Sequence, residues 1–146
     1  MMRLKFTRRP NPVLPEHRPI YKIAQLLLIL HYSRGGKSSL LRLHLLNWIV
    51  KSQSRIDSLC KGLESGSLLF LTWGFDPAVA IAIRFALAEK LVSETSTGYK
   101  IEPKGKIFVN DFMKDTALLH LERTALSGVG TSVTERMVES IAKDWK

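Results

Sequence analysis

The fold of this chain is decided by residues 76–112, DPAVAIAIRFALAEKLVSETSTGYKIEPKGKIFVNDF. The pair Asp76-Pro77 predicts the start of a helix, because an N-cap acceptor precedes a proline whose missing N–H costs nothing at the first helical position. We expect this helix to run to about Leu91. Its residues are apolar on nearly every side, and a helix of that kind is normally buried on every side.

Two short strands and another helix are predicted after this apolar helix. The strands are expected at 92–95 and 99–101, joined by a turn that contains Gly98, and the next helix is expected over 106–114. The order of helix, two-stranded hairpin and helix resembles the second half of a winged helix-turn-helix domain. In that family the helix before the hairpin usually reads DNA, which requires donors and acceptors on its outer face. We therefore expect the apolar helix to pack on its own domain with one face and on a protein partner with the other; the alternative is that the domain covers both faces.

The chain has 146 residues and a formal net charge of +9. We expect a mainly α-helical winged helix-turn-helix with a small β-hairpin wing. The organisation is predicted as a basic, proline-rich arm (1–17), a winged-helix domain (18–114) and a C-terminal helical extension (115–146). The basic charge lies in residues 1–61, with twelve Lys and Arg against two acidic residues. Such a half can meet nucleic acid or an acidic protein surface.

Helices are also expected on either side of the deciding stretch. Before it, they are predicted from Pro19 to about Ser33, from Ser38 or Ser39 to about Lys51, and over 54–65, and an apolar run at 68–73 is expected to be a strand or an extended connector that can serve as the third strand of the wing. After it, residues 108–127 are expected to be mostly helical, as one helix or as two that meet near Asp115-Thr116, with a break at 128–130. A capping box at Ser132 and Glu135 predicts a last helix with a stripe of Val133, Met137, Ile141 and Trp145.

No motif in the sequence predicts catalysis, a metal or a cofactor. The run Gly35-Gly36-Lys37-Ser38 lacks both the earlier glycine and the preceding strand of a phosphate loop, so we interpret it as a turn and a helix cap. The four histidines are scattered without ligand spacing and are expected at the surface or its boundary. The single cysteine, Cys60, and the absence of a visible signal peptide favour the cytoplasm. We expect a binding protein rather than an enzyme.

A more specific resemblance is carried by short motifs along residues 18–113. They are Arg18-Pro19-Ile20-Tyr21-Lys22, Ser38-Ser39-Leu40, Leu46-Asn47-Trp48, Phe75-Asp76-Pro77, Gly98-Tyr99 and Pro103-Lys104-Gly105. The layout resembles the small winged-helix middle component of bacterial three-component systems built around an SMC- or Rad50-like ABC ATPase, including Lamassu-type anti-phage defence. That resemblance implies a non-enzymatic subunit that bridges the ATPase and an effector such as a nuclease. The alternative is a winged-helix transcriptional regulator that binds DNA.

Two groups of residues are expected to make contacts. The group expected to bind a protein partner is Trp73, Phe75, Ile81, Arg84, Phe85, Met137, Ile141 and Trp145. The group expected to touch nucleic acid without sequence preference is Arg3, Lys5, Arg8, Arg9, Lys37 and Arg42.

Overall fold

The computed structural model describes residues 19–65 and 76–143. Its elements in chain order are α1 (Pro19–His31), the 3₁₀ turn η2 (Arg34–Gly36), β1 (Lys37–Ser38), α2 (Leu40–Ile49), α3 (Gln53–Ser65), α4 (Pro77–Ala88), β2 (Val92–Glu94), β3 (Tyr99–Ile101), α5 (Pro103–Phe112), α6 (His120–Val129) and α7 (Glu135–Lys143). The described part is mainly helical and contains the β2–β3 hairpin, as expected, and a third strand, β1, completes a small antiparallel sheet. The arm, the apolar run at 68–73, Trp73, Phe75 and Trp145 lie outside the described residues.

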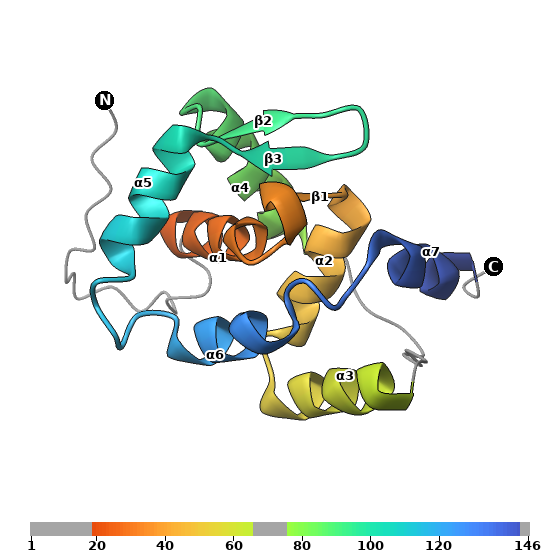
Figure 1. Cartoon of the computed structure of the whole chain (residues 1–146). Helices are drawn as coiled ribbons and strands as arrows, with labels where there is room; N and C mark the ends of the chain where they lie inside the picture. The colour runs from red at the N-terminus through yellow and green to blue at the C-terminus, as the bar shows by residue number, and fades with distance from the viewer. Residues whose placement is uncertain (1–18, 66–75, 144–146) are drawn as a thin grey trace.

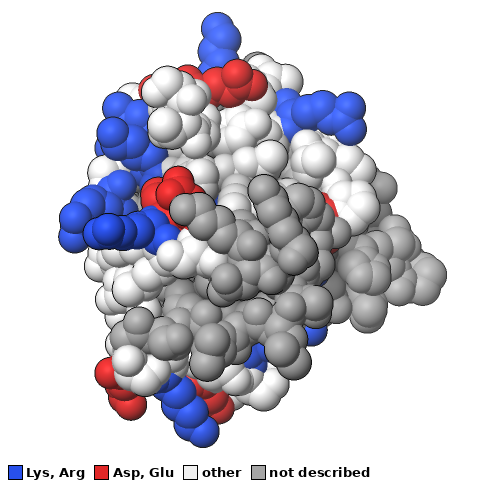
Figure 2. Space-filling view, turned by 90° about the vertical axis from the view of Figure 1, so that its right-hand side faces the viewer, with Lys and Arg blue, Asp and Glu red and all other residues white. Residues whose placement is uncertain are grey.

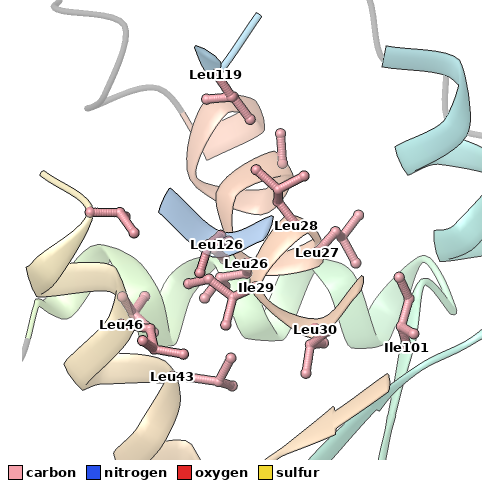
Figure 3. Close-up of a cluster of buried hydrophobic side chains, with 14 of the residues drawn as sticks. Leu26, Leu27, Leu28, Ile29, Leu30, Leu43, Leu46, Ile101, Leu119 and Leu126 are labelled. Carbon is pink, nitrogen blue, oxygen red and sulfur yellow. The ribbon is translucent and has the colours of Figure 1, made fainter. Parts of the chain in front are cut away.

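Helix α1 is the centre of the fold. It packs against α4, α5, α2 and α6, and the strand β3 also reaches it (Figure 1). Every residue of α1 from Lys22 to Leu30 is buried. In Figure 3 the side chains of Leu43 and Leu46 of α2, Leu126 of α6 and Ile101 of β3 lie around the leucines and Ile29 of α1. A helix with apolar residues on all sides needs such neighbours all round, so α1 determines where the other helices lie.

The small sheet has the strand order β1-β3-β2, with both pairings antiparallel. In the hairpin, Val92 lies opposite Ile101, and both side chains are buried. The third strand is β1, two residues that pair with the outer side of β3 so that Lys37 lies opposite Lys100. The expectation of a turn and helix cap at 35–38 was therefore incomplete, because the residues after Gly36 also pair with the hairpin. Ser39 caps α2, since its Oγ accepts a hydrogen bond from the Arg42 backbone N–H.

Helix α4 ends at Ala88, three residues before its expected end. Lys90 adopts a left-handed conformation with φ of 59°. The backbone N–H of Leu91 then donates to the carbonyl oxygen of Ala86 at 2.9 Å, and that of Lys90 donates to Leu87 at 3.1 Å. These two bonds form a Schellman-type ending, which satisfies carbonyls of the last turn and directs the chain into β2.

The C-terminal residues differ from the expectation at two points. The capping box is wrong: Thr134 Oγ1 accepts from the Met137 N–H, while Glu135 binds Ser39 of α2. Gly128 does not break the helix either, because α6 continues to Val129. Gly130 lies directly against α1, since an added Cβ would be 2.4 Å from the Tyr32 carbonyl oxygen. Helices α6 and α7 are thus packed on the helices that precede them.

Among the described residues, no helix combines the length and the apolarity needed to cross a membrane.

The two C-terminal glycines provide a matched test of this packing. Gly130→Ala should destabilise the fold by about 1–3 kcal/mol, because the new methyl group overlaps backbone oxygens of Tyr32 and Leu126. Gly128→Ala should stabilise it by about 0.5–1 kcal/mol, because a Cβ there meets nothing within 4 Å and alanine favours a helix. Urea unfolding of both variants measures the difference. Equal effects would show that Gly130 does not pack on the end of α1.

Candidate functional site

Helix α4 has one buried face and one exposed face. Val79, Ala82, Ile83 and Ala86 are buried against the body of the fold. On the other side, Ile81 is 42% exposed and Phe85 is 47% exposed. The two side chains are four residues apart and therefore neighbours on the helix surface. This arrangement matches the expectation that α4 packs on its own domain with only one face.

The charges next to this apolar face are basic. Arg84 and Lys90 are both exposed. The acidic neighbour, Glu89, lies 3.8 Å from the ammonium group of Lys104, so its charge is offset within the domain. We use the term α4 outer face for Ile81, Arg84, Phe85 and Lys90. It combines two large apolar side chains with two positive charges.

The residues of α7 are placed differently from the other expected partner contacts. In α7, Val138 is buried and Met137 is half-buried, and Val133, just before the helix, is also buried. Because α7 packs on α2, part of its apolar side faces the domain itself. The expected stripe omitted Val138, which is its most buried residue. The side chain of Ile141 lies outside the described set.

The nucleic-acid prediction does not hold for Arg42. This side chain is 3% exposed and donates to three acceptors: Ser33 Oγ at 2.6 Å, the Val133 carbonyl at 2.7 Å and the Gly130 carbonyl. The buried Arg42 side chain therefore links α2 to the residues that follow α6. Sequence reasoning placed it on a polar side of α2, because nothing local shows that the C-terminal residues cover that side.

Lys37 does lie at the surface. Both Lys37 and its cross-strand partner Lys100 are exposed, so two like charges stand opposite each other on the outer face of the sheet. On the molecular face shown in Figure 2, Lys and Arg side chains stand in separate groups, and carboxylates lie beside most of them. The other expected nucleic-acid contacts, Arg3, Lys5, Arg8 and Arg9, belong to the arm.

A buried polar cluster, absent from the sequence prediction, lies where α1, α2 and α4 meet. The ammonium group of Lys22, on the fully buried side of α1, donates to Asn47 Oδ1 at 3.0 Å and lies 3.4 Å from Asp76 Oδ2. Lys51 also donates to Asp76 Oδ2 at 3.0 Å. Asp76 Oδ1 accepts from the Ala78 N–H at 2.9 Å, which confirms Asp76 as the cap of α4.

The electrostatics of this cluster follow from burial and pairing. Burial alone would raise the pKa of Asp76, but the hydrogen bonds from Lys51 and the Ala78 N–H and the charges of both lysines lower it to about 2. Burial, together with the charge of Lys51, lowers the pKa of Lys22, and the Asp76 carboxylate acts in the opposite direction. His44, expected near the surface, is buried in α2, and its burial lowers the pKa.

A second polar group lies beside the first, between α1 and α6. Glu122 Oε2 accepts from Gln25 Nε2 at 2.7 Å and from the Tyr21 hydroxyl at 3.0 Å. These side chains, together with Lys51 and Asp76, line a pocket of about 660 Å³. The sequence of α1 did indicate that polar side chains are buried here. Lys22 and Gln25 interrupt a helix that is otherwise apolar on all sides, so both had to be buried and paired.

No group of acidic, histidine or cysteine side chains in residues 19–65 and 76–143 is arranged to hold a metal ion. Comparison with family models, with curated proteins and with solved structures finds no match to this chain.

The Asp76 pKa makes a prediction about acid stability. A carboxylate whose pKa falls on folding stabilises the fold above its unfolded value, and this contribution is lost as the pH drops toward the folded value. The fall in the Asp76 pKa from 3.8 to about 2 corresponds to about 2 kcal/mol of folding free energy. Asp76→Asn should therefore cost at least about 2 kcal/mol at neutral pH, with the difference shrinking below pH ~4. Asn retains capping ability, so the change reports the charge.

Chemical denaturation between pH 3 and pH 7 measures this difference. Asp111→Asn is the control, because that exposed carboxylate has only an exposed lysine beside it. A loss of stability in Asp76→Asn that is the same at every pH would contradict the ion-pair interpretation.

Proposed function

We propose that this chain is a non-enzymatic adaptor of winged-helix type that binds a protein partner through the α4 outer face. The observation that carries the proposal is the exposure of Ile81 and Phe85 on the helix that precedes the hairpin. An exposed pair of large apolar side chains on one helix face marks an interaction site more often than isolated apolar residues do.

The winged-helix assignment is supported by the order and pairing of the elements. Helix α4, the hairpin of β2 and β3, and α5 follow one another directly, and β1 adds a third strand beside β3. In Figure 1 the hairpin stands at the top, next to α4 and α5. In a winged helix of this layout, α4 is the helix that would enter the major groove of DNA.

The chemistry of α4 favours protein over DNA. Base edges in the major groove are recognised by hydrogen-bond donors and acceptors. On the α4 outer face only Arg84 and Lys90 carry such groups, and Lys90 follows the end of the helix. Ile81 and Phe85 offer apolar surface instead, with room for a partner to cover roughly half of each side chain. Aromatic and arginine side chains are enriched among the residues that dominate protein interfaces.

The proposed occupant of this face is a helical segment of a partner protein. Its apolar residues would pack on Ile81 and Phe85, and its acidic residues would face Arg84 and Lys90, because those two charges have no acidic partner among the described residues. The resemblance to middle components of ABC-ATPase systems identifies the partner to test first. We therefore extend the proposal to an SMC- or Rad50-like ATPase and an effector in bacterial anti-phage defence.

Two variants on α4 test the docking proposal. Glutamine favours a helix at least as well as isoleucine or phenylalanine, so Ile81→Gln and Phe85→Gln should preserve α4 while they replace apolar surface with a polar amide. Each should weaken binding to the SMC-like ATPase by about tenfold or more, which is about 1.4 kcal/mol. Calorimetric titration or co-purification with an SMC-like ATPase, if the gene neighbourhood encodes one, gives the measurement.

The control for these variants is Ile107→Gln on α5. Ile107 is 68% exposed and lies outside the α4 outer face, so its replacement should leave binding unchanged. Equal loss of affinity in all three variants would show that general surface hydrophobicity, not α4, determines binding. The absence of any SMC-like ATPase gene near this one would remove the partner assignment and leave only the docking face to test.

One observation favours a second function, contact with DNA. Like charges placed opposite each other on neighbouring strands are destabilising unless something neutralises them, and Lys37 and Lys100 are such a pair. Two neighbouring phosphate groups of a DNA backbone on the outer face of the sheet would neutralise both. Phosphate contacts give affinity without sequence preference, so this role is compatible with an adaptor that binds DNA inside a larger complex.

The DNA contact predicts a particular salt dependence. The chain should bind random and selected duplexes equally and weakly, with affinity that falls steeply as salt rises. Replacing Lys37 and Lys100 together by Gln should reduce the slope of log K against log salt by about 2. The matched control replaces two exposed lysines elsewhere, Lys61 on α3 and Lys114 just beyond α5, by Gln. This double variant should change the slope less than the Lys37 and Lys100 variant does. Tight binding to one sequence at high salt would instead support the transcriptional regulator.

A further inference from the structure

A pocket between the end of α1 and α5, here called the α1–α5 pocket, has no acidic residue in its lining. Its volume is about 470 Å³, and its lining residues are His31, Gly35, Gly36, Ile101, Lys106 and Asn110. The pocket beside the buried polar cluster differs, because Asp76 and Glu122 line it. Basic and neutral polar groups without a carboxylate among them create a positive potential, which suits an anion.

Three side chains of the α1–α5 pocket can donate hydrogen bonds into it. Lys106 and Asn110 are four residues apart on α5 and therefore lie on one face of that helix. His31 reaches the same pocket from the end of α1. All three residues are exposed, so a ligand can reach them. Their side chains form no hydrogen bond or ion pair with another residue in the described part of the chain.

The positive charge in this pocket is not compensated locally. Burial lowers the pKa of His31, and the charge of Lys106 lowers it further. A nearby carboxylate would act in the opposite direction. The ammonium group of Lys106 therefore acts on the imidazole without an acidic group in the lining to offset it.

The end of α1 does not oppose an anion strongly, although free carbonyl oxygens at a helix C-terminus carry partial negative charge. The Leu28 carbonyl accepts from the Tyr32 N–H at 3.1 Å, and the Ile29 carbonyl accepts from the Ser33 hydroxyl at 2.6 Å. The Leu30 carbonyl accepts from the Ser33 N–H at 3.0 Å. These bonds offset the partial charges of the last turn.

One wall of the pocket is formed by the glycine pair that precedes β1. Gly35 and Gly36 have φ of 67° and 68°, a conformation that other residues rarely adopt. A Cβ on Gly36 would lie only 2.9 Å from Ile101 Cγ2, so the backbone packs directly on that side chain. The run Gly35-Gly36-Lys37-Ser38 is not a phosphate loop, but its glycines leave this wall free of side chains that would keep an oxyanion away.

We propose that the α1–α5 pocket binds a phosphate group through Lys106, Asn110 and His31. A phosphate presents oxygens in several directions and can accept from donors on two helices, whereas a carboxylate presents two oxygens in one plane. The phosphate can belong to a nucleic-acid backbone or to a small phosphorylated molecule, since the recognition chemistry is the same. Neither the α4 outer face nor Lys37 lines this pocket, so the site is tested separately from the proposed function.

The test uses the full chain, with inorganic phosphate as the probe and acetate at equal ionic strength as the planar comparison. Nuclear magnetic resonance titration should show saturable phosphate binding with a Kd of about 1–10 mM, as suits so small a ligand. The shifts should be centred on the His31 ring and the Asn110 side-chain amide, and acetate should bind at least about fivefold more weakly. Lys106→Gln should weaken phosphate binding about tenfold, and Lys106→Arg should retain it, because arginine keeps the charge and the donors.

Lys104→Gln is the matched control, because Lys104 carries the same charge on the same helix but pairs with Glu89 and does not line the pocket. This variant should bind phosphate like the unmodified chain. Equal losses of affinity in Lys104→Gln and Lys106→Gln would overturn the proposal. So would phosphate binding no tighter than acetate binding, or shifts that lie away from His31 and Asn110.

A short DNA duplex distinguishes the two sources of the phosphate. If the duplex shifts the same His31 and Asn110 signals, and Lys106→Gln weakens its binding more than Lys104→Gln does, the phosphate belongs to nucleic acid. If inorganic phosphate binds and the duplex leaves these signals unchanged, a small phosphorylated molecule is the ligand.

Discussion

The burial of α1 on every side is the constraint on which the rest of the structure depends. Four other helices and β3 contact it, and its residues from 22 to 30 lose nearly all contact with solvent. Because each apolar side chain contributes in proportion to the area it buries, the largest hydrophobic stabilisation in the described chain comes from covering this helix. The same coverage forces Lys22 and Gln25 into the interior, so the polar clusters are a consequence of where α1 lies.

Asp76 connects that constraint to the proposed binding face. Its carboxylate caps α4 through the Ala78 N–H and also pairs with Lys22 of α1. A buried ion pair of this kind contributes little net stability against an apolar replacement, but removing one partner leaves the other charge uncompensated. We infer that its main effect is geometric. Holding the first turn of α4 against α1 determines which side of α4 faces inward, and therefore leaves Ile81 and Phe85 outside.

The sequence predicted the elements whose signals are local. Asp76-Pro77 begins α4, the glycine turn joins β2 to β3, and Ser39 caps α2, each through contacts within a few residues. The half-exposed apolar face of α4 was also predictable, because a small domain cannot cover such a helix completely. The two-residue strand β1 was missed, since a strand that short has no periodicity and is defined only by its pairing with β3.

The residues predicted wrongly are those whose contacts come from parts of the chain far away in the sequence. Arg42 looks like part of a polar helix side until the carbonyl oxygens of Gly130 and Val133, about ninety residues further on, are placed above it. Glu135 fits a local capping box with Ser132, yet its carboxylate accepts from the backbone N–H and the hydroxyl of Ser39. Both errors have one cause, which is that α7 packs on α2.

The contact between α7 and α2 also explains why α2 is capped so completely. Ser39 Oγ accepts from the Arg42 N–H, as an N-cap does, and its own N–H and hydroxyl donate to Glu135. In an ordinary capping box the acidic residue is the third of the same helix, a position that Arg42 occupies here. With the acidic residue supplied from α7, Arg42 is free to bind the chain between α6 and α7. The start of α2 and α7 therefore stabilise each other, and α6 and α7 of the predicted C-terminal extension pack on the helices that precede them.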